Sequence, residues 1–74
     1  MSKLPLISGE KAIKAFAKIG YKIVRQKGSH IRLHHQDRYK EPLTIPNHKV
    51  LDKGLLRRLL RDSQLTVSEF IELL

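Results

Sequence analysis

Two short segments of high β-propensity follow each other closely in this 74-residue chain, at residues 21–26 and 29–35. Only Lys27 and Gly28 separate them, and so short a connection can join two strands only as an antiparallel hairpin. Gly28 supplies the positive φ angle that a two-residue hairpin turn requires. Any fold of this chain must therefore be built around this hairpin.

The second strand of the hairpin alternates between apolar and polar residues. Ile31 and Leu33 would pack on a core, because successive side chains of a strand point to opposite faces of a sheet. His30, Arg32 and His34 would share the other face. An imidazole beside a permanent positive charge would then lie on an open face, and we expect the functional site there.

A helix is predicted before the hairpin, over residues 8–19. Ser8 can cap its first turn, because a serine hydroxyl accepts a hydrogen bond from an unpaired backbone N–H group. Gly20 follows the helix and suits the positive φ angle of a helix C-terminus. Apolar residues recur behind Ser8 with helical spacing, at Ala12, Ile13, Phe16, Ala17 and Ile19.

A third strand and a second helix are predicted after the hairpin. Leu43 and Ile45 would face the core from the strand, and the flanking Pro42 and Pro46 suit strand ends because proline donates no hydrogen bond to a neighbour. The helix begins near Asp52 and has an apolar stripe formed by Leu55, Leu56, Leu59 and Leu60. Its other side carries Arg57, Arg58 and Arg61, whose positive charge suits the C-terminal part of a helix and could alternatively dock an acidic partner protein.

The chain closes with a short helix over residues 67–74, introduced by the capping box Thr66-Val67-Ser68-Glu69. The predicted order is thus helix, three antiparallel strands, helix and short helix. Helices at both ends of an antiparallel sheet can pack together on one of its faces, which gives a two-layer α+β fold with the other face open. No linker or repeat interrupts this order, so we expect one domain over residues 1–74.

The chain has a formal net charge of +8 and a pI near 10.2. Such an excess on a small protein usually indicates a polyanionic partner, such as nucleic acid or an acidic protein. Residues 11–36 contain no Asp or Glu but contain Lys11, Lys14, Lys18, Lys22, Arg25, Lys27 and Arg32. A basic face kept only for solubility is the alternative. An amphipathic membrane helix is disfavoured, because Ala12 and Ala17 lack the bulk of a lipid-facing stripe.

The chain contains no cysteine, which excludes disulfides and thiolate metal sites and fits a reducing compartment. Residues 1–7 include no apolar run of signal-peptide length, and no segment approaches the length of a membrane span. We therefore expect a cytoplasmic protein that makes no contact with a membrane.

The four histidines form a poor metal site. His30 and His34 would lie ~13 Å apart on an extended strand, at ~3.3 Å per residue, which is too far for both to bind one tetrahedral ion. His34 and His35 point to opposite faces, and only a cross-strand contact with His48 could bring two imidazoles together. No Asp, Glu or Cys is placed to complete the set, so we expect no metal and no other cofactor.

Catalysis by a side-chain nucleophile is also disfavoured, because Ser29 and His30 are neighbours in a strand and face opposite ways. RNA, however, carries its own nucleophile in the 2′-hydroxyl group, and an imidazole can accept or donate a proton near neutral pH. Arg32, Lys27 and the backbone N–H groups near Gly28 could stabilise the charge of the phosphorane. From residue types alone, His30 is such a catalyst, a phosphate contact or an ordinary surface residue.

Several motifs of the chain occur in the same order in a known family. They are Gly20-Tyr21, Arg25-Gln26-Lys27-Gly28-Ser29-His30, Thr44-Ile45-Pro46-Asn47-His48, Gly54-Leu55-Leu56-Arg57-Arg58-Leu59-Leu60-Arg61 and Leu65-Thr66-Val67-Ser68-Glu69-Phe70. Through them nearly the whole chain resembles the HicA (YcfA-like) toxins of toxin–antitoxin pairs. The resemblance implies a fold similar to the double-stranded RNA-binding domain. It also implies an mRNA interferase that cuts mRNA without a metal and is neutralised by a HicB-like antitoxin covering the active site.

The resemblance also selects among the candidate residues. It implies that His30, in the Gly-Ser-His motif, is the catalytic acid or base. The expected RNA or phosphate contacts are Lys27, Gly28, Ser29, Arg32, His48 and Lys49. His34 and His35 have no motif support and are interpreted as surface residues. The family usually has Thr where this chain has Leu55; a hydroxyl there could help to cap the second helix, and we expect the difference not to affect His30.

A non-catalytic module that binds double-stranded RNA is the competing hypothesis. The same fold and charge would suit shape-based binding across a minor groove. Such a module would bind duplexes with a steep salt dependence and would cut no strand. Its binding energy would be spread over many Lys and Arg side chains instead of depending on His30.

Overall fold

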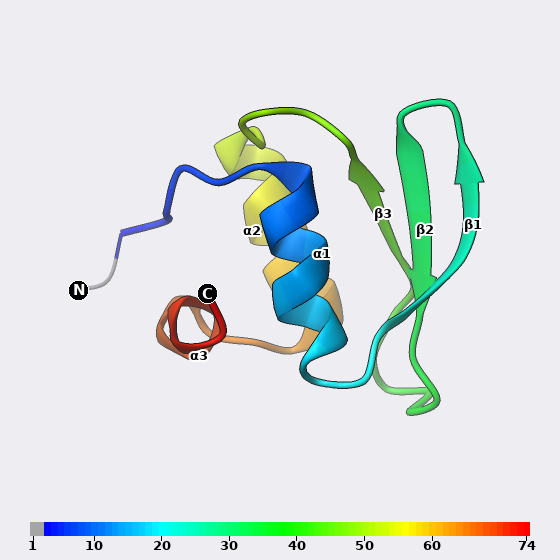
Figure 1. Ribbon diagram of the computed structural model, residues 1–74. Coiled ribbons are helices and arrows are strands. Elements are labelled where there is room, and N and C mark those ends of the chain that lie inside the picture. Colours follow the sequence, from blue (N-terminus) through cyan, green and yellow to red (C-terminus); the bar gives the residue numbers. More distant parts are fainter. Residues whose placement is uncertain (1–2) are drawn as a thin grey trace.

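The computed structural model describes residues 3–74. In chain order its elements are α1 (Gly9–Ala17), β1 (Lys22–Lys27), β2 (His30–His34), β3 (Leu43–Pro46), α2 (Lys53–Ser63) and α3 (Val67–Glu72). The sheet has the order β1-β2-β3, with both neighbouring pairs antiparallel, and the helices lie on one side of it (Figure 1). This confirms the predicted α+β architecture with one open sheet face. No helix within residues 3–74 is long and apolar enough to cross a membrane.

The first helix and the hairpin form where local signals place them, within one or two residues. The Ser8 hydroxyl accepts a hydrogen bond from the backbone N–H of Lys11 over 3.1 Å and caps α1. The hairpin turn consists of Gly28 and Ser29 instead of Lys27 and Gly28, and the φ angle of Gly28 is 60°. The positive φ angle expected of Gly28 is therefore present in a turn that starts one residue later.

The capping box of α3 is also present. The Thr66 hydroxyl accepts from the backbone N–H of Glu69 over 3.1 Å, and the Glu69 carboxylate accepts from the backbone N–H of Thr66 over 2.8 Å. The second of these hydrogen bonds stabilises the charged carboxylate and holds the pKa of Glu69 below its usual range. The short last helix thus begins where its sequence predicts.

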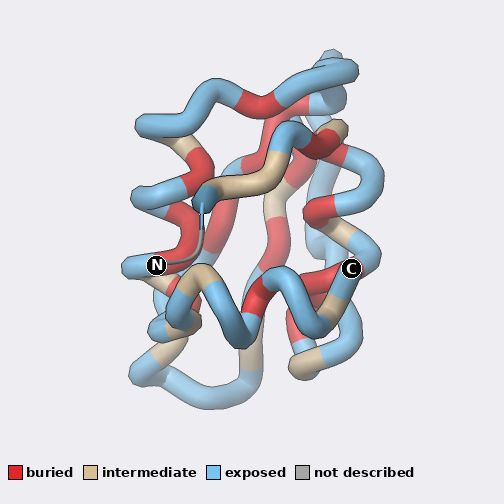
Figure 2. Tube along the Cα trace, turned by 90° about the vertical axis from the view of Figure 1, so that its left-hand side faces the viewer, coloured by how far each residue is buried: buried red, intermediate tan, exposed pale blue. Residues whose placement is uncertain are grey.

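The core lies between the helices and the inner face of β2 and β3 (Figure 2). The inward residues of both strands are buried as predicted, namely Ile31, Leu33, Leu43 and Ile45. The ring of Phe16 contacts the rings of Phe70 and Tyr21, with centroids 5.2 and 5.8 Å away. In α1 it is Ala15 that is buried, whereas Ala17 is exposed, so the apolar stripe predicted for this helix was wrong at Ala17.

Strand β1 differs from the others because every one of its residues is exposed. Its pairing with β2 shifts by one residue at Val24, so that Ile23 lies opposite Leu33 and Arg25 lies opposite Arg32. Regular alternation would put Ile23 and Arg25 on the same face, but an extra residue between them reverses the face of everything that follows. The second half of β1 therefore turns its basic side chains toward the open face.

Hydrogen bonds to Tyr21 and to α2 fix the connection between β2 and β3. The hydroxyl of the buried Tyr21 donates to the carbonyl of Glu41 over 2.8 Å. The backbone N–H of Glu41 donates to the carbonyl of Asp62 over 2.9 Å, and the ammonium group of Lys40 donates to the carbonyl of Ser63 over 2.7 Å. This polar connection is therefore anchored both to Tyr21 and to the last residues of α2.

Tyr21 is expected to make the fold sensitive to alkaline pH. Burial raises its pKa from 10.0 to about 12, and the negative charges of Asp62, Glu41 and Asp37 add to the increase. The folded protein keeps a hydroxyl proton that the unfolded chain loses, so stability present below pH 10.0 is lost as the pH rises toward 12, by roughly 2–3 kcal/mol. The free energy of unfolding in urea should fall less steeply across this range for Tyr21→Phe than for the control Tyr39→Phe. Equal slopes would contradict this prediction.

His35 is not the surface residue that the sequence suggested. Its Nδ1 accepts a hydrogen bond from the backbone N–H of Asp37 over 2.9 Å. A neutral imidazole has one donor and one acceptor, so Nε2 carries the hydrogen and donates to the carbonyl of Ile19 over 2.7 Å. The ring also contacts Tyr21 edge-on, with centroids 5.0 Å apart. His35 therefore ties the end of β2 to the turn after α1, where Gly20 leaves room for it.

Replacing Gly20 with alanine is expected to destabilise the protein more than replacing Gly28. Both glycines have positive φ angles, of 105° and 60°, so alanine is strained at each. At Gly20 the new Cβ would also lie 2.7 Å from Nε2 of His35, whereas at Gly28 nothing lies within 4 Å. We expect Gly20→Ala to lose about 1–3 kcal/mol more than Gly28→Ala in urea unfolding at neutral pH. Equal losses would show that His35 moves away freely.

Candidate functional site

His30 is the first residue of β2, and its side chain is exposed. Its pairing partners are Lys27 in β1 and Pro46 in β3. The carbonyl of the preceding Ser29 accepts a hydrogen bond from the backbone N–H of Asn47 over 2.7 Å. The segments that carry the Gly-Ser-His and Ile-Pro-Asn-His motifs, which are distant in the sequence, therefore lie side by side.

The first residue of α1 holds the loop that carries His48. The backbone N–H of Gly9 donates to the carbonyl of His48 over 2.9 Å. There is no room for a side chain at Gly9, because a Cβ atom would collide with the carbonyl oxygen of Pro46. Gly9 was not predicted to contribute to the site, because no residue near it in the sequence indicates a contact with residues 46–48. Gly9 sets the path of the chain as it leaves β3.

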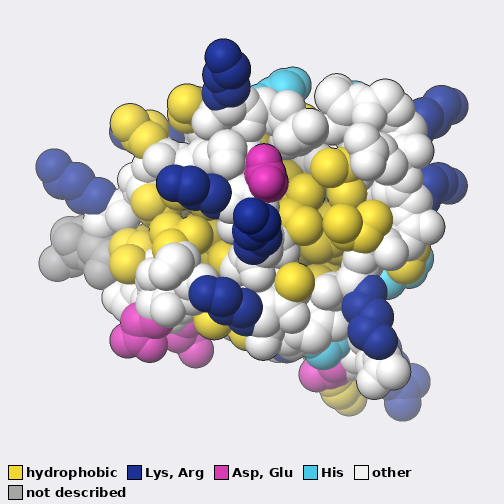
Figure 3. All heavy atoms as spheres, in the orientation of Figure 1, with side chains coloured by type: hydrophobic (Ala, Val, Ile, Leu, Met, Phe, Trp, Pro, Cys, Tyr) yellow, Lys and Arg dark blue, Asp and Glu magenta, His cyan; other side chains and the backbone are white. Residues whose placement is uncertain are grey.

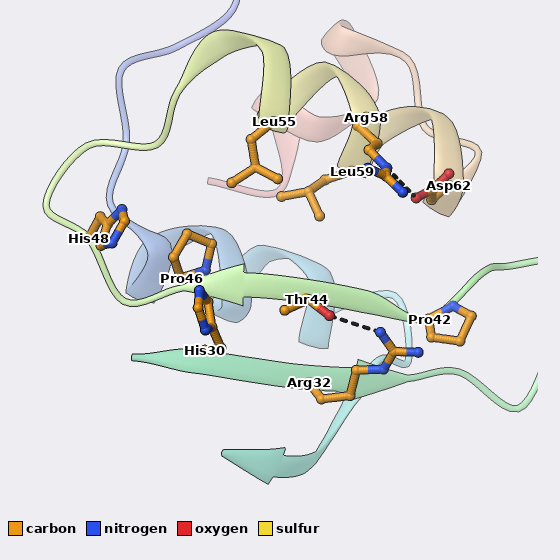
Figure 4. A pocket seen from close by; sticks show the side chains of 10 residues that line it. All are labelled: His30, Arg32, Pro42, Thr44, Pro46, His48, Leu55, Arg58, Leu59 and Asp62. Atoms are coloured by element: carbon orange, nitrogen blue, oxygen red, sulfur yellow. Dashed lines mark hydrogen bonds and ion pairs between the residues drawn. The ribbon is translucent and has the colours of Figure 1, made fainter. Parts of the chain in front are cut away.

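A groove of about 360 Å³ lies between the β3 edge of the sheet and α2 (Figure 4). The sheet and the loop after it contribute His30, Arg32, Pro42, Thr44, Pro46 and His48. The facing wall comes from α2 and consists of Leu55, Arg58, Leu59 and Asp62. The sequence predicted a site on the open sheet face alone, and the contribution of α2 to its border was missed.

Two further residues of α2 border the groove. Arg58 lies there with its Nε 3.9 Å from a carboxylate oxygen of Asp62. Leu55 lines the same groove as His30. The start of α2 needs no hydroxyl at position 55, because the Asp52 carboxylate accepts from the backbone N–H groups of Gly54 and Leu55 over 3.0 and 3.3 Å.

A second hollow lies on the open sheet face, next to the groove. It is lined by Arg25, Lys27, His30, Arg32 and Thr44 and is called the cationic hollow below. The Arg32 guanidinium group donates to the Thr44 hydroxyl over 2.8 Å (Figure 4) and to Nε2 of His34 over 3.4 Å. Arg25 was not among the predicted site residues, because only the shifted pairing at Val24 brings it to this face.

The positive charges of the cationic hollow lack acidic partners within residues 3–74. Arg25 lies directly opposite Arg32 on the neighbouring strand, and Lys27 lies directly opposite His30. The like charges of Arg25 and Arg32 destabilise the sheet in these positions. The ion pairs of residues 3–74 lie elsewhere and join Lys14 with Glu10, Arg58 with Asp62 and Arg61 with Asp62. A polyanion bound on this face would supply the missing counter-charge.

Basic groups are also spread over the side of the molecule that α1 covers. Figure 3 shows Lys and Arg side chains across this side, with few acidic groups between them. Apolar side chains reach the surface between the basic groups (Figure 3), and beside α1 a hollow is lined by Ile13, Ile23 and Ile31. The excess of positive charge is therefore not confined to the cationic hollow, where it surrounds His30.

The remaining predicted RNA contacts are Gly28, Ser29 and Lys49, of which the first two adjoin the cationic hollow. Gly28 and Ser29 form the turn between Lys27 and His30, at the end of the cationic hollow. Lys49 is exposed and lines neither the groove nor the cationic hollow. No group of three His, Cys, Asp or Glu side chains within residues 3–74 could hold a metal ion. The arrangement can thus offer a phosphate group positive charge and an imidazole for proton transfer.

Comparison with known proteins places the chain in a family. A family model described as "HicA toxin of bacterial toxin-antitoxin" matches residues 9–65. The matched range includes α1, the sheet and α2. A search of curated proteins found no match. The chain belongs to the HicA toxin family, the toxins of bacterial toxin–antitoxin systems.

Proposed function

We propose that this toxin is an endoribonuclease that cuts mRNA without a metal ion and uses His30 as a general acid or base. The observation that carries the proposal is the position of His30, which borders both the cationic hollow and the groove. An RNA backbone bound by Arg25, Lys27 and Arg32 would bring a phosphate group to this imidazole. Membership in a toxin family supports an activity that harms the host cell.

The proposed reaction uses the 2′-hydroxyl group of RNA as the nucleophile. Its oxygen bonds to the adjacent phosphorus while a base takes its proton, and the bond from phosphorus to the 5′-oxygen breaks while an acid protonates that oxygen. The products are a 2′,3′-cyclic phosphate and a 5′-hydroxyl group. His30 performs one of the two proton transfers, and Arg32 and Lys27 stabilise the charge on the phosphorane. Further RNA contacts are proposed for Gly28, Ser29, His48 and Lys49.

Membership in a toxin–antitoxin family implies an antitoxin partner. We infer that this partner is a HicB-like protein that covers the open sheet face around His30. The charges of Arg25, Lys27 and Arg32, which have no acidic partner within residues 3–74, favour an acidic surface on the partner. Such a cover would neutralise the toxin by keeping RNA from the cationic hollow.

The test is incubation of the purified protein with single-stranded and duplex RNA of the same sequence, in parallel with and without EDTA. We expect cleavage of the single strand into fragments that end in a 2′,3′-cyclic phosphate and begin with a 5′-hydroxyl group. Complete inhibition by EDTA would contradict the metal-free mechanism. Duplex binding with a steep salt dependence and no scission would identify a non-catalytic RNA-binding module instead.

A further inference from the structure

We propose that the groove between β3 and α2 is a nucleobase subsite, and that Asp62 makes it select bases that carry an amino group. The inference rests on the proposed function, because it places the base beside the phosphate group that His30 would act on. The groove and the cationic hollow share His30, Arg32 and Thr44, so one nucleotide can reach both. The phosphate would occupy the cationic hollow, and the attached base would enter the groove.

The walls of the groove suit the flat, weakly polar faces of a base. Leu59 and Pro46 are buried and Leu55 is half-buried, and all three line the groove (Figure 4). The volume of about 360 Å³ lies within the range of small-ligand sites, roughly 300–1,000 Å³. Leu55 and Leu59 project from α2 toward β3 (Figure 4). A base inserted between them and Pro46 would remove apolar surface from water on both of its faces.

The polar end of the groove carries the Asp62 carboxylate beside the Arg58 guanidinium group, whereas no acidic side chain lines the cationic hollow. Asp62 lies in the groove, and its carboxylate contacts the side chains of Arg58 and Arg61 only at 3.9 and 4.0 Å. These long contacts leave the carboxylate oxygens free to accept hydrogen bonds from a ligand. An ionised carboxylate accepts hydrogen bonds and donates none, so its oxygens can bind an N–H donor of a base but not the oxygens of a phosphate group.

The four RNA bases differ in what they offer a carboxylate. Adenine and cytosine present an exocyclic amino group, and guanine presents an amino group beside a ring N–H. Uracil has no amino group, and the two carbonyl oxygens that flank its ring N–H would be repelled by Asp62. A hydrogen bond to a charged group typically contributes enough to change affinity about tenfold or more. Asp62 therefore favours the amino-bearing bases over uracil.

The test is NMR titration of the full-length protein with the four ribonucleoside 5′-monophosphates, followed through the methyl groups of Leu55 and Leu59. We expect these methyl signals to shift with AMP, CMP and GMP, and to shift with UMP only at about tenfold higher concentration. Asp62→Ala should remove this difference, whereas Arg61→Ala, which removes a neighbour of Asp62 that does not line the groove, should keep it. Leu55→Ala should weaken the binding of all four nucleotides. The control Leu65→Ala should not, because Leu65 is also half-buried but does not line the groove.

Three results would overturn the proposal: no shift of either leucine, equal affinity for the four nucleotides, or a difference that survives in Asp62→Ala. The same preparation is assayed for RNA cleavage, so that failure of the subsite and failure of the proposed function can be told apart. RNA cleavage without shifts of the leucine signals would refute the subsite and agree with the proposed ribonuclease activity. Base-dependent leucine shifts without cleavage support the subsite and refute the ribonuclease. Amide spectra of each variant establish that it is folded.

Discussion

His30→Gln is expected to lower the rate of RNA cleavage by roughly 10²–10⁴-fold, the usual contribution of one positioned acid or base. Glutamine keeps much of the size and hydrogen-bonding capacity of histidine but cannot transfer a proton at neutral pH. The fold should not change, because the His30 side chain is exposed and residue 30 pairs with the neighbouring strands through its backbone. The variant should also no longer arrest growth when it is expressed without an antitoxin.

His34→Gln is the matched control for this prediction. His34 lies in the same strand and on the same face as His30, and it is also exposed. Cleavage rates of both variants are compared on one single-stranded RNA, and thermal unfolding shows whether each is folded. Full activity in His30→Gln would contradict the proposed role, and so would an equal loss in both variants. Binding of the antitoxin to His30→Gln should persist, because the cationic side chains around it are unchanged.

Gly9→Ala is expected to cost about 1–3 kcal/mol of stability and to impair cleavage as well. The new methyl group would collide with the backbone of Pro46, and backbone at the end of a paired strand cannot swing aside as a side chain can. Relief of the collision must move the segment from Pro46 to His48, which is tied to the hairpin turn through the hydrogen bond from Asn47 to Ser29. Stability and site geometry are therefore coupled at Gly9.

Gly54→Ala serves as the control, because Gly54 also lies in the first turn of a helix. The nearest atom to a Cβ there is a carboxylate oxygen of Asp52 at 3.1 Å, at the end of a side chain that can adjust. Alanine favours a helix over glycine by roughly 0.5–1 kcal/mol, which offsets a small adjustment of the Asp52 cap, so Gly54→Ala should cost much less stability than Gly9→Ala. Urea unfolding of both variants measures the difference. A Gly9→Ala protein as stable as Gly54→Ala would contradict the account of this contact.

The features predicted well from the sequence are those that neighbouring residues determine. The hairpin follows from Gly28, the faces of β2 follow from the alternation between His30 and His34, and Ser8 caps α1 where expected. Each depends on the chemistry of a few consecutive residues and on the regular geometry of a helix or a strand. The open sheet face with His30 could therefore be predicted before the structure.

The features that were missed depend on contacts between distant segments. Arg25 reaches the cationic hollow only because one extra residue is accommodated at Val24, and alternation alone predicts the opposite face. Gly9 matters only because residues 46–48 pass beside it. His35 is held by the turn after α1 and by its own loop, and α2 borders the groove through tertiary packing. No local pattern specifies these approaches.

Attack by the 2′-hydroxyl group of RNA is the central claim, and a substrate with a single 2′-deoxynucleotide tests it most directly. The position cut by the protein is first mapped on a short single-stranded RNA, and the nucleotide on its 5′ side is then replaced by its 2′-deoxy form. We predict that the modified strand still binds but is no longer cut at that position, because the nucleophile is missing. Continued cleavage at the deoxynucleotide would contradict the account, since water or a protein side chain would then have to be the nucleophile.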